Sequence, residues 1–377
     1  MSTDGNAPNR HLVQGGLLRA ILQLAAPMLA SALLQNVQSL IDLFWVGRLG
    51  ADAIAALAMS GTVLMMLFTI IIGLATGTVA IVSRTVGAAS FREASQNAGQ
   101  SLLWSGVLGV LVGILGAAVT PSILRLLGAR PGVLALGTQY LRISFAGSFT
   151  IFLLFIGNSV LQGAGNTFIP MCAMLTANLI NIVLDPLLIF GVGFFPRLEI
   201  RGAAAATVAA QAIAAAGVVV VLSRGAAGMR IHARDWRPHI SRALRILRVG
   251  MPACGQMLSR SLMALVLMRI VASCGMHAVA AYGIGLRFHM IILMPAFALG
   301  NAAATMVGQN LGAGRPRRAQ KAAWLAVLID ACIMLVAGIA IVGLAPGMMK
   351  LFSREPEVVT IGTRYFRTVS LFYVFAG

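Results

Sequence analysis

The segment FIPMCAMLTANLINIVLDPLLIFGVG, residues 168–193, indicates which class of fold this chain adopts. It is longer than the about 20 residues a helix needs to cross a ~30 Å hydrocarbon core, and its apolar residues do not alternate with polar ones as in a strand. Nine further segments of this kind lie at 17–47, 54–82, 98–120, 138–162, 202–223, 245–273, 278–308, 322–345 and 358 to the C-terminus. We therefore predict an all-α integral membrane protein with about ten spanning helices.

The composition agrees with a membrane protein. Hydrophobic residues make up 59% of the 377 residues, charged residues only 10%, and the mean hydropathy is +0.91. A net charge of +18 would suggest a nucleic-acid partner in a soluble protein. Here the arginines stand in short loops between apolar segments, a pattern that sets membrane topology. We therefore expect contact with membrane lipid and no nucleic-acid partner.

The basic loops predict the orientation in the membrane. The linker 224–243 is rich in arginine, and the loop after 278–308 carries Arg315, Arg317, Arg318 and Lys321. By the positive-inside rule both loops face the cytoplasm. An even number of spans precedes each of them, so we expect a cytoplasmic N-terminus in a multi-pass protein of the cell inner (plasma) membrane. Residues 1–14 are polar and show no cleavable signal peptide, so the first helix is expected to stay as an anchor.

A shift of 225 residues superposes the first half of the chain on the second. Pro27 then meets Pro252, and Tyr140 meets Tyr365. This register predicts two parallel-repeat six-helix bundles, an N-terminal lobe at 1–223 and a C-terminal lobe at 244–377, joined by the linker 224–243. Residue 377 corresponds to Phe152 of the first repeat, so we expect twelve helices in the complete fold, about ten of them here, and a truncated second bundle.

Polar side chains inside the apolar segments are candidates for function, because charge is costly in hydrocarbon. Gln35, Gln38, Ser39 and Asp42 share one face of the first helix at spacings of three, four and seven, and Asn178, Asn181 and Asp185 repeat the arrangement on another. Nearby helices could add Asn158, Gln162, Thr207 and Gln211. The two faces predict a wet, oxygen-rich pocket that holds a monovalent cation or shares a proton. The alternative is that these groups only form hydrogen bonds that hold the helices together.

Other intramembrane residues leave their roles open. Asp330 is as compatible with a structural hydrogen bond between helices as with a functional role, since no row of polar residues accompanies it on its helix. Pro27 and Pro186 remove helical hydrogen bonds; Pro27 either bends the first helix during function or is a static kink. Arg260 and Arg287 either line a cavity for anionic groups or reach a membrane interface.

Motifs for other kinds of chemistry are missing from the sequence. It has no GxxxxGK[ST] phosphate loop, no HExxH and no GxSxG. Its four cysteines fall in apolar segments without CxxC spacing, so neither zinc nor disulfides are indicated. We expect no enzyme activity and no prosthetic cofactor, and an ion gradient as the energy source.

Three segments together resemble a known family, the multidrug and toxic compound extrusion (MATE) transporters. They are LAAPMLASALLQNVQSLIDLFWVGRLGADAIAAL at 24–57, GNSVLQGAGNTFIPM at 157–171, and NLINIVLDPLLIFG at 178–191 followed by RGAAAATVAAQ at 201–211. The resemblance implies a two-lobed transporter that exports amphipathic, often cationic, small molecules in exchange for Na⁺ or H⁺.

The resemblance also implies roles for particular residues. It assigns Asp42, Asn181, Asp185 and Thr207 to the coupling site, with Na⁺ possible at the first three, and Pro27 to helix bending. With the polar faces, it makes Gln35, Gln38, Asn158 and Asn178 candidates for substrate binding. We expect a monomer.

One departure and two alternatives accompany this interpretation. Many members of the family carry a carboxylate on the seventh helix, whereas LRVGMPACGQMLSRSLMALVLM, residues 247–268, has none. A flippase for a lipid-linked sugar would share the architecture but would need a strongly cationic cavity. An inactive truncated remnant is the third hypothesis.

Overall fold

The computed structural model describes residues 10–193, 195–225, 228–352 and 355–373, and its regular elements are all helices. The first part of the chain forms α1 (Arg10–Gln14), α2 (Leu17–Gly47), α3 (Ala51–Gly87), α4 (Phe91–Leu126), α5 (Pro131–Ala146), α6 (Ser148–Gly163), α7 (Phe168–Phe190) and α8 (Ile200–Arg224). The second part forms the 3₁₀ turn η1 (Ala233–Trp236), α9 (Ile240–Ser273), α10 (Met276–Gly312), α11 (Pro316–Phe352) and α12 (Pro356–Ser370).

Eight of the described helices are long and apolar enough to cross a membrane, namely α2, α3, α4, α7, α8, α9, α10 and α11. The prediction of one continuous helix at 138–162 was wrong, because the chain bends there by 50° between α5 and α6. The bend falls at Gly147, where a Cβ would collide with Val208 of α8. Ser148 then donates its hydroxyl to the Gly109 carbonyl of α4, at 2.6 Å. Close packing against two neighbours thus fixes the break, and the bent pair can count as a ninth span.

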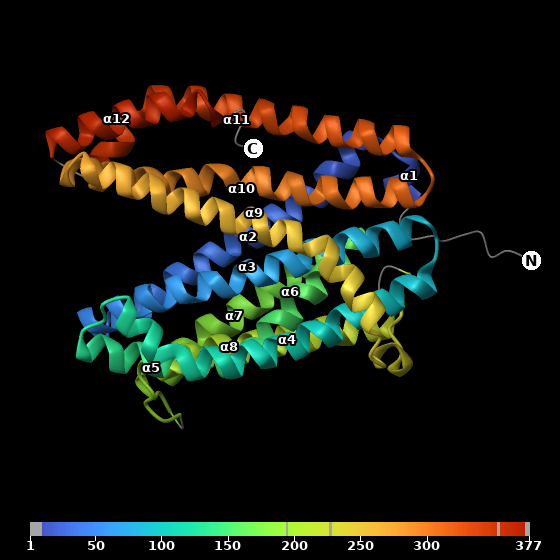
Figure 1. The fold of residues 1–377 in the computed structure, drawn as a ribbon, viewed down its shortest axis with the longest axis horizontal. Coiled ribbons are helices and arrows are strands. Elements are labelled where there is room, and N and C mark those ends of the chain that lie inside the picture. The colour runs from blue at the N-terminus through green and yellow to red at the C-terminus, as the bar shows by residue number, and fades with distance from the viewer. Residues whose placement is uncertain (1–9, 194, 226–227, 353–354, 374–377) are drawn as a thin grey trace, which may run out of the picture.

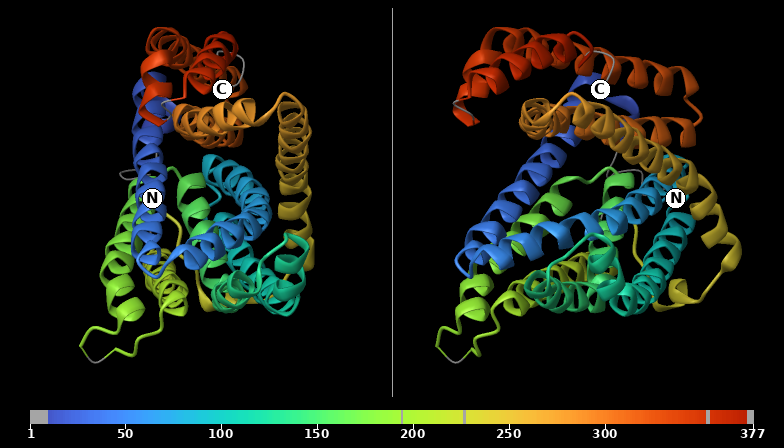
Figure 2. Two further views of the ribbon diagram at one scale, coloured as in Figure 1. Left: turned by 90° about the vertical axis from the view of Figure 1, so that its left-hand side faces the viewer. Right: turned by 60° about the vertical axis from the view of Figure 1, so that its left-hand side comes forward.

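The helices form two groups connected by two long helices, α2 and α9 (Figures 1 and 2). Helices α3 to α8 share two apolar cores, and α10, α11 and α12 share another. The first half of α2 packs on α10 and α11 through Ile21, Leu24 and Met28. In the opposite sense, α9 begins against the first group, with Ile246 in its core, and ends beside α10. Helices α2 and α9 therefore each belong partly to both groups.

Helix boundaries recur at the offset on which the predicted repeat rests. α3 and α10 both have 37 residues and begin 225 positions apart. Gly50 and Gly275 precede them with φ of 113° and 101°, a conformation that glycine adopts without steric cost. The interpretation of this offset as a duplication stays a prediction.

The two groups meet most closely where α3 and α10 end. A Cβ on Gly87 would collide with the backbone carbonyl of Gln309, and a Cβ on Gly312 would collide with that of Arg84. Each helix thus offers a glycine to the backbone of the other, at positions 225 residues apart. Gln309 also donates its side-chain amide to the Gly163 carbonyl of α6 at 3.0 Å. This contact closes the space between the groups at the end that carries the basic loops.

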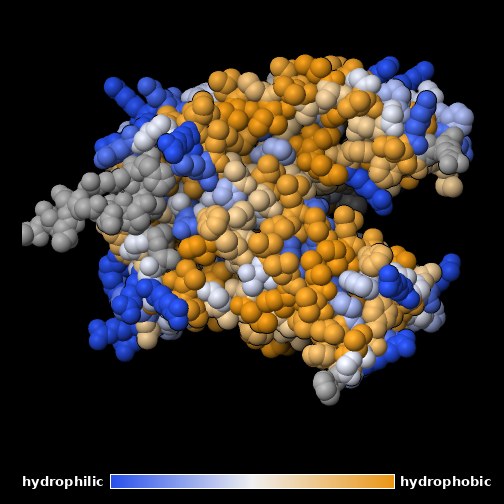
Figure 3. Space-filling model, turned by 180° about the vertical axis from the view of Figure 1, so that it is seen from behind, coloured by the Kyte–Doolittle hydropathy of each residue, from blue (hydrophilic) through white to orange (hydrophobic). Residues whose placement is uncertain are grey.

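The opposite end of the molecule is more open. The space-filling view from behind shows an indentation between the two groups at the end away from the N-terminus (Figure 3). The most apolar stretch of α9 has no buried residue in the part of the chain that the structure describes. The two groups therefore diverge from the glycine contact toward the other side of the membrane.

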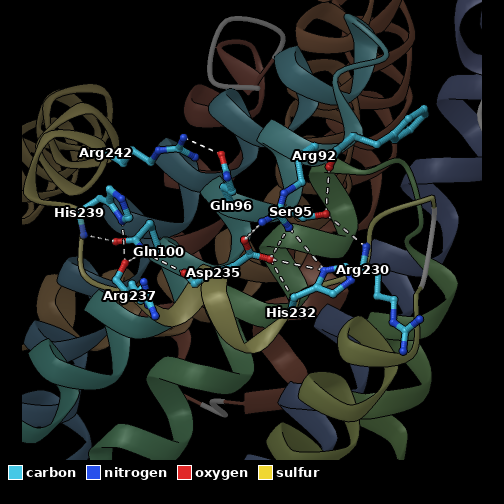
Figure 4. Close-up of polar contacts among 11 residues, drawn as sticks. Arg92, Ser95, Gln96, Gln100, Arg230, His232, Asp235, Arg237, His239 and Arg242 are labelled. Carbon is cyan, nitrogen blue, oxygen red and sulfur yellow. Dashed lines mark hydrogen bonds and ion pairs between the residues drawn. The ribbon is translucent and has the colours of Figure 1, made fainter.

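The Arg-rich linker is folded against α4 (Figure 4). Asp235 is buried and forms an ion pair with Arg92 at 3.0 Å. Gln100 donates to the carbonyls of Asp235 and Arg237 at 2.9 and 2.6 Å, and accepts from the amide of His239 at 2.8 Å. The start of α9 is thereby fixed to the first group of helices.

Candidate functional site

Two cavities lie between α2 and its neighbours. One, of about 300 Å³, is lined by Gln35, Gln38, Ser39, Asp42, Leu57, Gly61, Leu64, Met65, Leu67, Phe68, Tyr140, Ser144, Ile151, Thr207, Val208 and Gln211. We call it the acidic cavity. The other, of about 260 Å³, is lined by Met28, Ser31, Ala32, Gln35, Ile72, Ala75, Thr76, Val79, Phe155, Asn158, Ser159, Gln162, Pro170, Met174, Met294, Phe297, Ala298 and Asn301. We call it the central cavity, because both groups of helices line it.

The acidic cavity has a hydrogen-bonded cluster at its wall. Asn181 and Asp185 lie one helical turn apart on α7 and are both fully buried. Asn181 donates its amide to Asp185 Oδ1 at 3.2 Å and contacts Thr207 Oγ1 at 3.4 Å. Thr207 donates to the Ala203 carbonyl at 3.0 Å, which turns its oxygen toward Asn181. Side chains of α7 and α8 thus hold the Asp185 carboxyl in one position.

Asp42 of α2 completes the cluster. Its carboxyl lies within hydrogen-bonding reach of the Asp185 carboxyl. Asp42 Oδ1, Asp185 Oδ2 and Asn181 Oδ1 are buried and have no hydrogen-bond partner among the described residues. Buried carboxyl and amide oxygens that lack a donor fit a hard monovalent cation or a shared proton. The structure therefore brings Asp42, Asn181, Asp185 and Thr207 together.

Tyr140 was not among the site residues predicted from the sequence. It lies on α5, lines the acidic cavity and is close enough to interact electrostatically with both carboxyl groups. Ser144, one turn later, lines the same cavity. The signal for this pair was present in the sequence, because two polar residues four apart share a helix face inside an apolar segment.

The candidate substrate-binding residues fall in three places. Gln35 lines both cavities, Gln38 lines the acidic cavity, and Asn158 lines the central cavity. Asn178 lines neither of them. Its amide donates to the Leu34 carbonyl of α2 at 2.6 Å, so it connects α7 to α2.

Pro27 lies inside α2, where it deprives the Gln23 carbonyl of its helical donor. The hydroxyl of Thr167 contacts this carbonyl at 3.4 Å. Asp330 lies on α11, apart from the cluster in the second group of helices, and its buried Oδ1 has no partner among the described residues.

Comparison with known proteins agrees with this geometry. The MatE family model matches residues 27–187 and 252–377, two segments that begin 225 positions apart. The chain belongs to the MATE family. It is therefore a multi-pass membrane transporter of the multidrug efflux type, and proteins of this family are not enzymes.

Curated relatives of this MATE protein have different names. It is 31% identical over 359 residues to the FAD transporter of Shewanella oneidensis, covering 93% of this chain and 78% of that one. It is 30% identical to the probable multidrug resistance protein YoeA of Bacillus subtilis, covering 95% and 78%.

Solved structures show the same architecture. An outward-facing MATE transporter superposes with a TM-score of 0.88 at 28% identity, covering 99% of this chain and 82% of that one. A MATE structure in a bent conformation superposes with the same TM-score at 29% identity, covering 97% and 81%.

Proposed function

We propose that this chain is a secondary active antiporter that exports amphipathic, chiefly cationic, small organic compounds in exchange for Na⁺ or H⁺. The observation that carries the proposal is the pair of neighbouring carboxyl groups of Asp42 and Asp185, each with one buried oxygen that has no hydrogen-bond partner among the described residues. Two carboxylates in a buried site repel each other, so a bound Na⁺ or one shared proton stabilises the pair. Asn181 and Thr207 supply the remaining polar atoms.

Coupling between ion and solute follows from the arrangement of the two cavities. Gln35 and Asp42 lie seven residues apart on one face of α2, and Gln35 lines both cavities. A movement of α2 that accompanies ion binding at Asp42 would therefore change the wall of the central cavity. Pro27 allows such a movement because it interrupts the hydrogen bonds of the helix.

Alternating access needs a path that is open to one side at a time. The glycine contact of α3 and α10 closes the end with the basic loops, and the opposite end is indented. With the basic loops and the N-terminus in the cytoplasm, as the positive-inside rule favours, this conformation faces outward. The similarity to an outward-facing MATE transporter supports this assignment.

Transport assays test the proposal and its main rival. Ethidium, a fluorescent amphipathic cation, should leave proteoliposomes that contain the purified chain when either a Na⁺ gradient or a pH gradient is imposed. Absence of ethidium efflux under each of the two gradients would contradict the antiporter.

A flippase for a lipid-linked sugar is the second candidate, because Arg260 and Arg287 are exposed on α9 and α10. It predicts instead that a fluorescent lipid pyrophosphate changes leaflet without either gradient.

A further inference from the structure

An arginine of α9 contacts a residue that lines the central cavity. Arg260 stands on α9, and its guanidinium lies 5.8 Å from the ring centroid of Phe297 on α10. Phe297 lines the central cavity. Arg260 is also 225 positions after Gln35, the residue of α2 that lines both cavities. The contact and the offset both place Arg260 beside the central cavity.

A position near the membrane interface does not account for Arg260. It lies 13 residues before the end of α9 at Ser273, about 20 Å along a helix. Arg269, four residues from that end, can reach the interface. An arginine at hydrocarbon depth is costly, and such residues generally face a partner or a wet pathway.

No acidic partner neutralises Arg260 in the part of the chain that the structure describes. The ion pairs found there do not include it, and neither α9 nor α10 contains Asp or Glu. His289 is close enough to interact electrostatically with Arg260; its ring stacks on Tyr373 at 5.4 Å, and its Nδ1 is buried without a partner among the described residues. The second group of helices thus presents an uncompensated cation and aromatic rings.

We propose that Arg260 and Phe297 form a subsite for the acidic group of an aromatic solute. A carboxylate or phosphate would accept hydrogen bonds from the guanidinium, and an attached planar ring would lie against Phe297. The substrates of this chain then include amphipathic zwitterions and anions, with any amino group directed to the acidic cluster. The inference rests on the proposed transport function and narrows its substrate class.

Binding of two flavins to the purified full chain tests the subsite. Riboflavin and flavin mononucleotide share one fluorescent ring and differ by a phosphate, so fluorescence titration isolates the contribution of the acidic group. Wild-type protein should bind the mononucleotide at least about tenfold more tightly than riboflavin, since a charged hydrogen bond is worth that factor. Arg260→Gln, which installs the amide found at position 35, should remove the preference, and Arg260→Lys should keep part of it. Arg269→Gln is the matched control on the same helix and should bind both flavins like wild type.

Three results would overturn the subsite. Equal affinities for the two flavins in wild type would do so without any variant, and so would a preference that survives in Arg260→Gln. Displacement of the mononucleotide by a few equivalents of phosphatidylglycerol would identify a lipid headgroup as the occupant instead. Ethidium efflux separates this inference from the proposed function. Ion-driven efflux with no phosphate preference rejects only the subsite, whereas a phosphate preference with no efflux of ethidium or of either flavin rejects antiport.

Discussion

Thr167 points its hydroxyl at the backbone carbonyl of Gln23, which Pro27 deprives of its helical donor. The oxygen atoms are 3.4 Å apart, and Thr167 is buried at the start of α7. The kink-prone part of α2 is therefore held by the helix that carries Asn181 and Asp185.

This contact predicts coupling between Thr167 and Pro27. Thr167→Val removes the hydroxyl with little change of shape, and should cost about 1 kcal/mol of stability. In a Pro27→Ala background the Gln23 carbonyl regains its helical donor, so the same substitution should cost much less. A double-mutant cycle of unfolding free energies in detergent measures the difference. Thr176→Val, which removes an exposed hydroxyl that donates within α7, is the control, and equal costs in both backgrounds would refute the contact.

The glycine contact between α3 and α10 predicts opposite effects at two glycines of one helix. A Cβ at Gly312 would collide with the Arg84 carbonyl, whereas a Cβ at Gly300 meets nothing within 4 Å. Gly312→Ala should therefore destabilise this conformation by about 1–3 kcal/mol. Gly300→Ala should be neutral or stabilise by up to about 1 kcal/mol, because alanine favours a helix. Thermal unfolding compares them; equal effects would mean that the helices are not in contact there.

The folded linker predicts a change in protease sensitivity. Asp235→Ala removes the buried partner of Arg92, so the linker should open more often and trypsin should cut after Arg230 at least about ten times faster. Glu93→Gln is the control, since its pair with Arg245 spans 3.9 Å between exposed side chains and should contribute little. Equal cleavage rates in both variants would show that Asp235 does not hold the linker.

The Tyr140 hydroxyl is predicted to support the coupling site. Tyr140→Phe removes a polar group beside both carboxyls, and should reduce ion-driven efflux several-fold while the protein stays folded. Tyr365→Phe, at the corresponding position of the second group, should have a smaller effect. Initial rates of ethidium efflux under a fixed gradient make the comparison. Equal losses in the two variants would count against a special role for Tyr140.

Most of the membrane-spanning helices could be predicted because their signal is local. The apolar segment 17–47 has the same bounds as α2, since its ends coincide with polar or glycine residues. The break at Gly147 could not be predicted in this way. It depends on Val208 and Gly109, which lie far away in the sequence and pack against the two sides of the bend.

In the candidate site, too, some residues could be predicted from local sequence and others needed the tertiary structure. Asp42, Asn181 and Asp185 could be selected because acids and amides at helical spacing in an apolar segment are rare. Tyr140 and the contact of Arg260 with Phe297 needed the tertiary structure, since each joins helices that are distant in sequence. The sequence predicted the linker only as a basic loop, because the ion pair that anchors it joins buried Asp235 to the exposed Arg92 of α4, which is distant in the sequence.

The most direct test of cation exchange at Asp42 and Asp185 is ion-driven ethidium efflux from proteoliposomes of wild type, Asp42→Asn and Asp185→Asn. Asp52→Asn, which removes an exposed carboxyl at the start of α3, makes the same chemical change outside the site and is the control. The account predicts that either site variant loses at least about tenfold in rate under the Na⁺ or pH gradient that drives wild type, while Asp52→Asn keeps the wild-type rate. Wild-type rates in both Asp42→Asn and Asp185→Asn would contradict it.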